Sequence, residues 1–158
     1  MFCQKCGTNL IIKKDNENKD IPYCDKCKEF RYPTYNIAVS MIVKYNNKII
    51  LIKQYKRDRY ILVAGYLSNY ESAEEALSRE LNEELGLKVI NYRFNETKYY
   101  EKTNTYMINF VVDGTGFISP NEEIDSYDLF NVEDALANIA KNSLAEYFLN
   151  QAIKRKIL

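Results

Sequence analysis

The sequence of 158 residues contains no histidine. Without imidazole the chain has no Ser-His-Asp or Cys-His nucleophile, no histidine general base and no histidine metal ligand. Any catalysis by this chain must therefore depend on carboxylates, lysine, tyrosine or a bound metal ion.

Long apolar runs are also missing. No run of apolar residues approaches the roughly 18 that a membrane-spanning helix needs. The N-terminal residues MFCQKCG do not follow the charged-then-apolar layout of a secretory signal. We therefore expect a cytoplasmic, soluble protein with no membrane partner.

Net charge is zero, but it is unevenly distributed. Residues 1–60 carry 13 Lys and Arg against 6 acidic residues, whereas residues 61–158 carry 9 against 16. A basic front half can attract polyanions, but a basic appendage followed by an acidic metal site explains the same asymmetry. We expect a small-molecule substrate, and not nucleic acid, as the main partner. A chain of this length holds one good core with a small appendage.

All four cysteines lie in two C-x-x-C pairs, Cys3 with Cys6 and Cys24 with Cys27. Two such hooks match a tetrahedral four-cysteine zinc site. Two disulfides or four free thiols are the alternatives, although disulfides require an oxidising compartment. Because four thiolates leave no position for water, such a zinc ion would be structural. Residues 1–33 would then form a zinc ribbon of two short hairpins, in which the metal replaces a core.

Residues 34–158 form a second predicted domain of mixed strands and helices. Strands are predicted at IAVSMIVKY, KIILIKQY and YILVAGY, with a tight hairpin turn at Asn46–Asn47. Further strands are predicted around KVINYRF, KYY and TYMINFVV, followed by a turn at Asp113–Gly116 and a returning strand in NEEIDSYDLFN. Two closing helices are predicted in VEDALANIA and SLAEYFLNQAIKRKIL.

A helix with three glutamates on one face follows the third predicted strand. The S-x-x-E stretch that begins at Ser72 is a capping box, and Gly86 is the expected C-terminal glycine. Glu80, Glu83 and Glu84 share one helical face, so their carboxylates repel by about 0.2–0.5 kcal/mol per pair. A solvated acidic face is one interpretation, and a hard divalent cation held by these carboxylates is the other.

The same helix belongs to a longer pattern, G-x5-E-x7-R-E-U-x-E-E-x-G-U, in which U is aliphatic. All nine specified positions are occupied, by Gly65, Glu71, Arg79, Glu80, Leu81, Glu83, Glu84, Gly86 and Leu87. This pattern resembles the signature of the Nudix hydrolases, enzymes that cleave diphosphates joining a nucleoside to another group. The resemblance implies an α/β/α sandwich with a mixed β-sheet, Mg²⁺ or Mn²⁺ as the catalytic cofactor, and often a homodimer.

The resemblance also implies roles for individual residues. Catalysis would fall to Arg79, Glu80, Glu83 and Glu84. The three glutamates would also bind the metal, and Arg79 would orient a catalytic glutamate through an ion pair. Gly65 would shape the loop over the metal, and a backbone oxygen near Ala64 would be a further ligand. One carboxylate from outside the signature usually completes such a site. Glu123 lies where the resemblance places it, and its neighbour Glu122 is the alternative.

A zinc ribbon followed by a Tyr-Pro linker and this core is similar to the NADH pyrophosphatase branch of the family, over nearly the entire chain. That branch carries a downstream SQPWPFP-type motif that helps to select dinucleotides, and the equivalent TKYYEKT stretch at 97–103 lacks it. Ser68 and Tyr70 also replace the Glu and Gly common in the branch. We therefore expect a hydrolase that cleaves a nucleoside diphosphate linked to another group. The alternatives are an NAD(H) or NAD-capped RNA pyrophosphatase and a non-catalytic nucleotide- or nucleic-acid-binding module.

Two pairs of residues are candidate substrate contacts. Arg57 and Arg59 lie in KQYKRDR, just upstream of Gly65, and could bind substrate phosphates, although a solvated loop is the plainer interpretation. Tyr99 and Tyr100 could stack on a base, although aromatic residues in a strand more often belong to the core.

Overall fold

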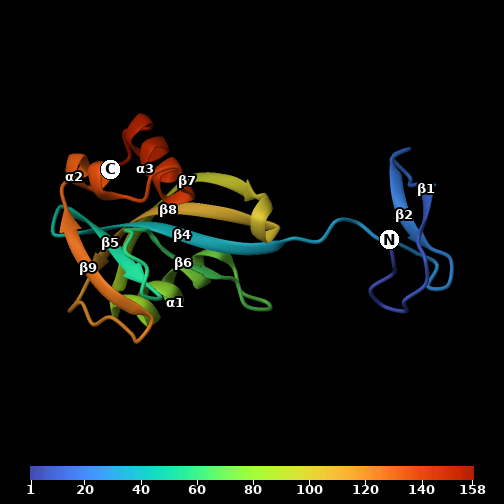
Figure 1. Cartoon of the computed structure of the whole chain (residues 1–158), viewed down its shortest axis with the longest axis horizontal. Helices are drawn as coiled ribbons and strands as arrows, with labels where there is room; N and C mark the ends of the chain where they lie inside the picture. Colours follow the sequence, from blue (N-terminus) through green and yellow to red (C-terminus); the bar gives the residue numbers. More distant parts are fainter. The chain divides into compact units, whose positions relative to one another are not determined.

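The computed structural model describes all 158 residues and divides into two compact units, Met1–Tyr35 and Asn36–Leu158 (Figure 1). The sequence predicts the boundary two residues earlier, between residues 33 and 34. Each unit has its own sheet and its own buried residues. None of the helices has both the length and the apolar character that a membrane crossing requires.

The first unit is an antiparallel sheet in the order β1-β2-β3, with strands at Ile11–Lys14, Asp20–Cys24 and Glu29–Phe30. Each C-x-x-C pair lies in a turn closed by antiparallel pairing. A bridge between Phe2 and Asn9 closes the first turn, and the pairing of β2 with β3 closes the second. Only two residues of this unit are buried, and both are cysteines, Cys3 and Cys24. The cysteine cluster therefore stands where a larger domain would have its hydrophobic core.

The second unit is built on a six-stranded mixed sheet in the order β7-β8-β4-β5-β9, with β6 paired to β4. Its strands are β4 (Asn36–Tyr45), β5 (Lys48–Gln54), β6 (Val63–Tyr66), β7 (Lys88–Tyr100), β8 (Thr105–Thr115) and β9 (Ile124–Phe130). Its helices are α1 (Ala73–Leu85), α2 (Val132–Asn138) and α3 (Leu144–Lys154), with a short 3-10 helix at Glu101–Thr103. The β4 and β8 strands are parallel, and the other pairs are antiparallel.

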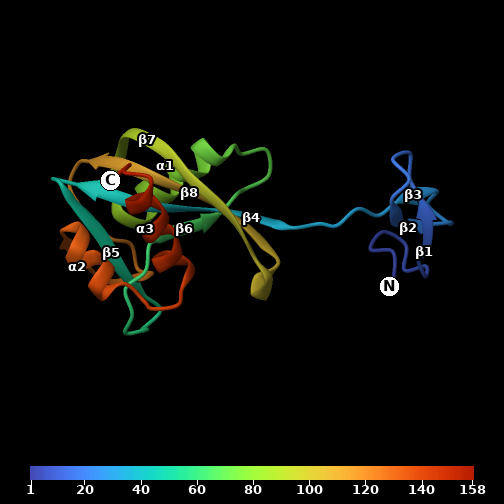
Figure 2. The same ribbon diagram turned by 90° about the horizontal axis from the view of Figure 1, so that it is seen from above.

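Alternate residues of β4 face opposite layers of helices. Val39 and Met41 belong to the core cluster that contains the buried leucines of α1, which are Leu77, Leu81 and Leu85. Ile42 belongs to the other cluster, with Phe148 of α3 and Ala135 of α2. Figure 1 shows α1 on one face of the sheet and α2 and α3 on the other, and Figure 2 shows the twist of β7 and β8 across it. The predicted α/β/α sandwich with a mixed sheet is confirmed.

Most predicted elements are present, with changed lengths. The turn between β4 and β5 has positive φ at Asn46 (49°) and Asn47 (61°), as predicted. The stretch YILVAGY is a strand only from Val63, and the stretches KVINYRF and KYY form one continuous strand, β7. The β8 strand continues to Thr115, past the predicted start of the turn at Asp113. Pairing with β7 along the whole of β8 explains both extensions, because each strand satisfies the other's backbone groups.

Candidate functional site

Helix α1 is fixed by its own local sequence. The Ser72 side chain accepts from the Glu75 N–H, and the Glu75 carboxylate accepts from the Ser72 N–H, which is the predicted capping box. Gly86 ends the helix in the left-handed region at φ 69°. With the leucine stripe packed on the sheet, Glu80 and Glu84 become buried at the edge of the helix and Glu83 remains exposed.

The three glutamates of α1 open into a cavity of about 530 Å³. Its lining residues are Ala38, Gln54, Tyr55, Ala64, Gly65, Tyr66, Glu80, Glu83, Glu84, Met107, Asn121 and Glu123. The structure thus brings Glu123 and the end of β6 to the carboxylates of α1. Glu122, the alternative to Glu123, does not line this cavity.

Glu123 reaches the cavity because its loop is tied to the end of α1. The last carbonyls of a helix have no partner within the helix. Here the Leu85 carbonyl accepts from the Ser119 N–H at 2.8 Å, and the Glu84 carbonyl accepts from the Asn121 N–H at 3.1 Å. These bonds hold the segment before β9 beside the acidic face of the helix.

Gly65 allows the Glu80 carboxylate to lie directly against β6. A Cβ atom at position 65 would be 1.9 Å from the Glu80 carboxyl carbon and 1.9 Å from its Oε1. Any side chain at this position would therefore displace the Glu80 carboxylate from its place in the cavity.

Arg79 forms ion pairs with three of the four glutamates of the signature, Glu71, Glu80 and Glu83. Its Nε and Nη2 donate to the two oxygens of Glu71 at 2.7 and 2.8 Å, a bidentate pair. Its Nη1 donates to Glu80 at 2.7 Å and to Glu83 at 3.1 Å, and Nη2 also donates to the Tyr66 carbonyl at 3.0 Å. The bonds from Arg79, followed by the Ser68 N–H, lower the pKa of Glu71 to about 2. Arg79 thus joins the helix to the loop that follows β6.

Glu84 and Glu123 have no cationic partner in the protein. Gln54 Nε2 donates to Glu84 at 3.2 Å, and the Tyr55 hydroxyl donates to Glu123 at 2.9 Å, but neither acid forms an ion pair. Burial, followed by the charge of Glu80, raises the pKa of Glu84 to about 8. Uncompensated negative charge and oxygen donors around one cavity fit a hard divalent cation such as Mg²⁺ or Mn²⁺.

Six cavity residues have no counterpart among the residues predicted from the sequence: Ala38, Gln54, Tyr55, Tyr66, Met107 and Asn121. Gln54 is the last residue of β5, and Gln54 and Tyr55 both lie within the basic KQYKRDR stretch. Their partners, Glu84 and Glu123, are 30 and 68 residues away in the chain. No local spacing could have identified these contacts.

The four candidate substrate contacts lie outside the cavity lining. Arg57 and Arg59 flank Asp58 around a shallow depression of about 310 Å³, and neither guanidinium forms an ion pair. Tyr99 donates its hydroxyl to the Asn104 side chain at 3.0 Å and packs its ring on Tyr106. Tyr100 is the last residue of β7.

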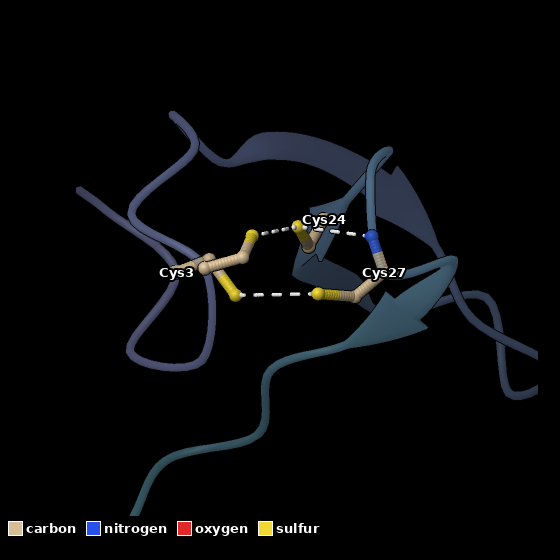
Figure 3. A group of neighbouring side chains, drawn as sticks. Cys3, Cys24 and Cys27 are labelled. Atoms are coloured by element: carbon tan, nitrogen blue, oxygen red, sulfur yellow. Dashed lines mark hydrogen bonds between the residues drawn. The ribbon is translucent and has the colours of Figure 1, made fainter.

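In the first unit, the four cysteine sulfurs converge on one point (Figure 3). All four Sγ atoms lie within 4.8 Å of one another, with Cys3 and Cys27 at 3.9 Å and Cys6 and Cys24 at 3.5 Å. Four thiolates about 2.3 Å from a tetrahedral zinc ion would be about 3.8 Å apart. The four cysteines are free thiols, and their spacing fits a zinc ion well.

Hydrogen bonds and charges around the thiols also favour a cation. Burial opposes ionisation of Cys3, but the Arg31 Nε, at 3.3 Å, and nearby backbone N–H groups lower its pKa to about 6. The hydrogen bond that the Cys27 thiol donates to Cys6, followed by burial, raises the pKa of Cys27 to about 12. Contacts with Thr8 lower the pKa of Cys6 as well, so the cluster favours thiolates at Cys3 and Cys6 and a protonated Cys27, unless a positive ion lies between the sulfurs.

Comparison with known proteins identifies the family to which residues 34–151 belong. A family model described as NUDIX domain matches residues 34–151. Curated relatives include the NAD-capped RNA hydrolase NudC of Vibrio parahaemolyticus, 25% identical over 96% of this chain and 59% of that protein. The NudC of Chromobacterium violaceum is 29% identical over 98% of this chain and 58% of that protein. The chain thus spans about three fifths of the length of these relatives.

Solved structures show the same fold. A NUDIX hydrolase from Nitrosomonas europaea has a TM-score of 0.69 at 21% identity, covering 99% of this chain and 92% of that one. An ADP-ribose pyrophosphatase from Streptococcus suis has a TM-score of 0.65 at 18% identity, covering 78% of this chain and 92% of that one. At these identities the similarity concerns the architecture.

Proposed function

The chain belongs to the NUDIX family, and on this premise we propose that it is a Mg²⁺- or Mn²⁺-dependent hydrolase of nucleoside diphosphates linked to another group. The bond cleaved is the one between the two phosphates. The observation that carries this proposal is the cavity that Glu80, Glu83, Glu84 and Glu123 line together with Gly65.

The metal-binding residues we propose are these four glutamates and the backbone oxygen of Ala64. A bound cation would neutralise phosphate oxygens and align them for attack, which a diphosphate needs because its own charge repels nucleophiles. Arg79 holds Glu80 and Glu83 in place through its ion pairs. One of the three helix glutamates would accept the proton of the attacking water.

For residues 1–33 we propose a structural zinc ion held by Cys3, Cys6, Cys24 and Cys27, and for residues 34–158 we propose the hydrolase domain. The four free thiols support zinc, since a disulfide framework would require a different arrangement of the sulfurs. They also favour a reducing compartment such as the cytoplasm. A homodimer is a further prediction, which sedimentation of the purified chain would test.

An NAD(H) or NAD-capped RNA pyrophosphatase is the second candidate. It is favoured by the match to NudC relatives, which extends over 96% of this chain and includes the cysteine unit. The TKYYEKT stretch, with Tyr99 and Tyr100, would then contact the base in place of the SQPWPFP-type motif. Arg57 and Arg59 would bind phosphates that lie beyond the cleaved bond, since both are exposed and without ion pairs.

A substrate panel tests these proposals. Purified protein is incubated with ADP-ribose, NADH and an NAD-capped oligoribonucleotide, each with Mg²⁺ or Mn²⁺, and the products are identified by mass spectrometry. Release of mononucleotides supports a diphosphate hydrolase, and the preferred member of the panel decides between the two candidates. If a broad diphosphate panel gives no turnover, the hydrolase proposal is wrong.

Two sets of variants sharpen the panel. Glu83→Gln should abolish turnover, while Glu74→Gln, an exposed residue of the same helix outside the cavity, should not. Replacing both Arg57 and Arg59 by Gln should raise KM for the capped oligonucleotide more than KM for ADP-ribose. Equal effects on both substrates would contradict the proposed phosphate contacts.

A further inference from the structure

The turn that ends β5 has an unusual backbone. Tyr55 and Lys56 both have positive φ, 55° and 56°, and the Arg57 N–H donates to the Gln54 carbonyl at 3.1 Å. Positive φ at both central residues is the geometry of a type I′ turn, which Gly and Asn adopt most easily. A tyrosine and a lysine adopt it at a cost in free energy, and such strain gathers at functional sites.

The strained turn delivers three successive donors to three acids on different elements. Gln54 Nε2 donates to Glu84 of α1 at 3.2 Å, and the Lys56 N–H donates to Asp125 of β9 at 2.5 Å. Between them the Tyr55 hydroxyl donates to Glu123 at 2.9 Å. The register of β5 against β9 shifts at Lys53/Gln54, just where the turn begins.

The Tyr55 bond is the contact that fixes the Glu123 carboxylate. The backbone of the Glu123 loop is held by α1 and by the Asn121 side chain, which accepts from the Glu123 N–H at 3.0 Å. The Glu123 side chain itself is exposed and forms no ion pair. Tyr55 binds its Oε2, so Oε1 remains available on a carboxylate whose direction is set.

We propose that Tyr55 is a positioning residue, which holds the Glu123 carboxylate toward the cavity so that it can bind the divalent cation. This inference rests on the proposed function, because it assumes that Glu123 is a metal ligand. A hydrogen-bonded partner outside the ligand set commonly orients a ligating side chain, and its loss costs about 10- to 100-fold in metal affinity. The strain at positions 55 and 56 is then the cost of aiming the phenol at Glu123.

Tyr55→Phe tests the proposal, because it removes the hydroxyl and keeps the ring. Binding of Mn²⁺ to the whole chain, without substrate, is measured by electron paramagnetic resonance. We expect an affinity about tenfold weaker than that of the wild type, with kcat at saturating Mn²⁺ changed less than about twofold. Tyr92→Phe is the matched control, since Tyr92 packs on Phe110 outside the cavity and should leave Mn²⁺ affinity unchanged.

A second variant separates positioning from a general structural role. In a Glu123→Gln background, Tyr55→Phe should cause no further loss of Mn²⁺ affinity, because the group through which Tyr55 acts is gone. The proposal is overturned if Tyr55→Phe binds Mn²⁺ like the wild type, or if its effect persists in Glu123→Gln. A loss confined to substrate KM would also overturn it, since Tyr55 would then contact substrate alone.

Failure of the proposed function looks different. A wild-type chain that binds no Mn²⁺ and hydrolyses no diphosphate refutes the hydrolase, and the positioning role with it. If the wild-type chain binds Mn²⁺ and is active, and Tyr55→Phe binds Mn²⁺ with the same affinity, only the positioning role is refuted.

Discussion

Replacing Gly65 by alanine should remove activity without unfolding the protein. The new Cβ would lie 1.9 Å from the Glu80 carboxyl carbon, whereas non-bonded carbon atoms approach to about 3.5 Å. The Glu80 carboxylate must therefore move by about 1.5 Å. It can do so because it is the end of a flexible side chain, but it then leaves its position in the cavity.

The expected magnitudes follow from that displacement. A misplacement of about 1 Å in a catalytic arrangement can cost about 100-fold, so we expect kcat to fall at least about 100-fold, or about 2.7 kcal/mol in activation free energy. The unfolding free energy should change by less than about 1 kcal/mol. Gly65 does not have positive φ, and alanine there restricts the unfolded chain, which offsets part of the weakened Arg79–Glu80 ion pair.

The assay compares kcat on the preferred diphosphate with urea unfolding of the metal-free chain. Gly114→Ala is the control, because its Cβ would meet no atom closer than 3.4 Å and the residue lies outside the cavity. It should retain kcat within about twofold. A Gly65→Ala variant with wild-type kcat would show that the position of Glu80 in the cavity does not matter to the reaction.

Three further outcomes can be measured. Arg79 is the main cause that lowers the pKa of Glu71 from 4.5 to about 2, so the Glu71 charge stabilises the fold above about pH 4.5 and this contribution is lost as the pH falls toward 2. The difference in unfolding free energy between wild type and Glu71→Gln, measured by urea unfolding at several pH values, should shrink over that range. A constant difference would contradict the ion pair. Burial is the main cause that raises the pKa of Glu84 to about 8, so the metal-free wild type should lose stability as the pH rises from about 4.5 to 8, while Glu84→Gln should not. With Mg²⁺, kcat of Glu84→Gln should be lower than that of the wild type by at least about 100-fold. Full activity of this variant would show that Glu84 is not part of the site. Cys24→Ser should lose bound zinc, measured by atomic absorption, and unchanged zinc content would refute the four-cysteine site.

Helix α1 shows what can be predicted from local spacing. Its start at Ser72, its end at Gly86 and its leucine stripe all depend on residues within about one or two turns of each other. The turn at Asn46–Asn47 is similar, since two asparagines in sequence accept positive φ readily. The mixed sandwich, by contrast, follows only from the resemblance of the signature to a family, because strand order depends on pairing across the chain.

Strand ends are less predictable for the same reason. The β7 strand runs unbroken from Lys88 to Tyr100 because β8 pairs with it along its length. The sequence predicts a break between KVINYRF and KYY because the intervening residues 95–97 are polar. The edge strand β7 accommodates these polar residues without interruption. Asn95 is even fully buried there, where its side chain donates to Asn109 and to the Phe148 carbonyl.

By itself the sequence determined the chemistry that the chain can offer: no imidazole, two cysteine hooks, and one helix with an arginine and three glutamates at fixed spacing. These features are local, so the geometry of a helix or a turn is enough to place them. Only the tertiary structure decided which distant groups meet them. Glu123 rather than Glu122 lines the cavity, on a loop that binds the end of α1, and Tyr55 reaches Glu123 across 68 residues through a strained turn.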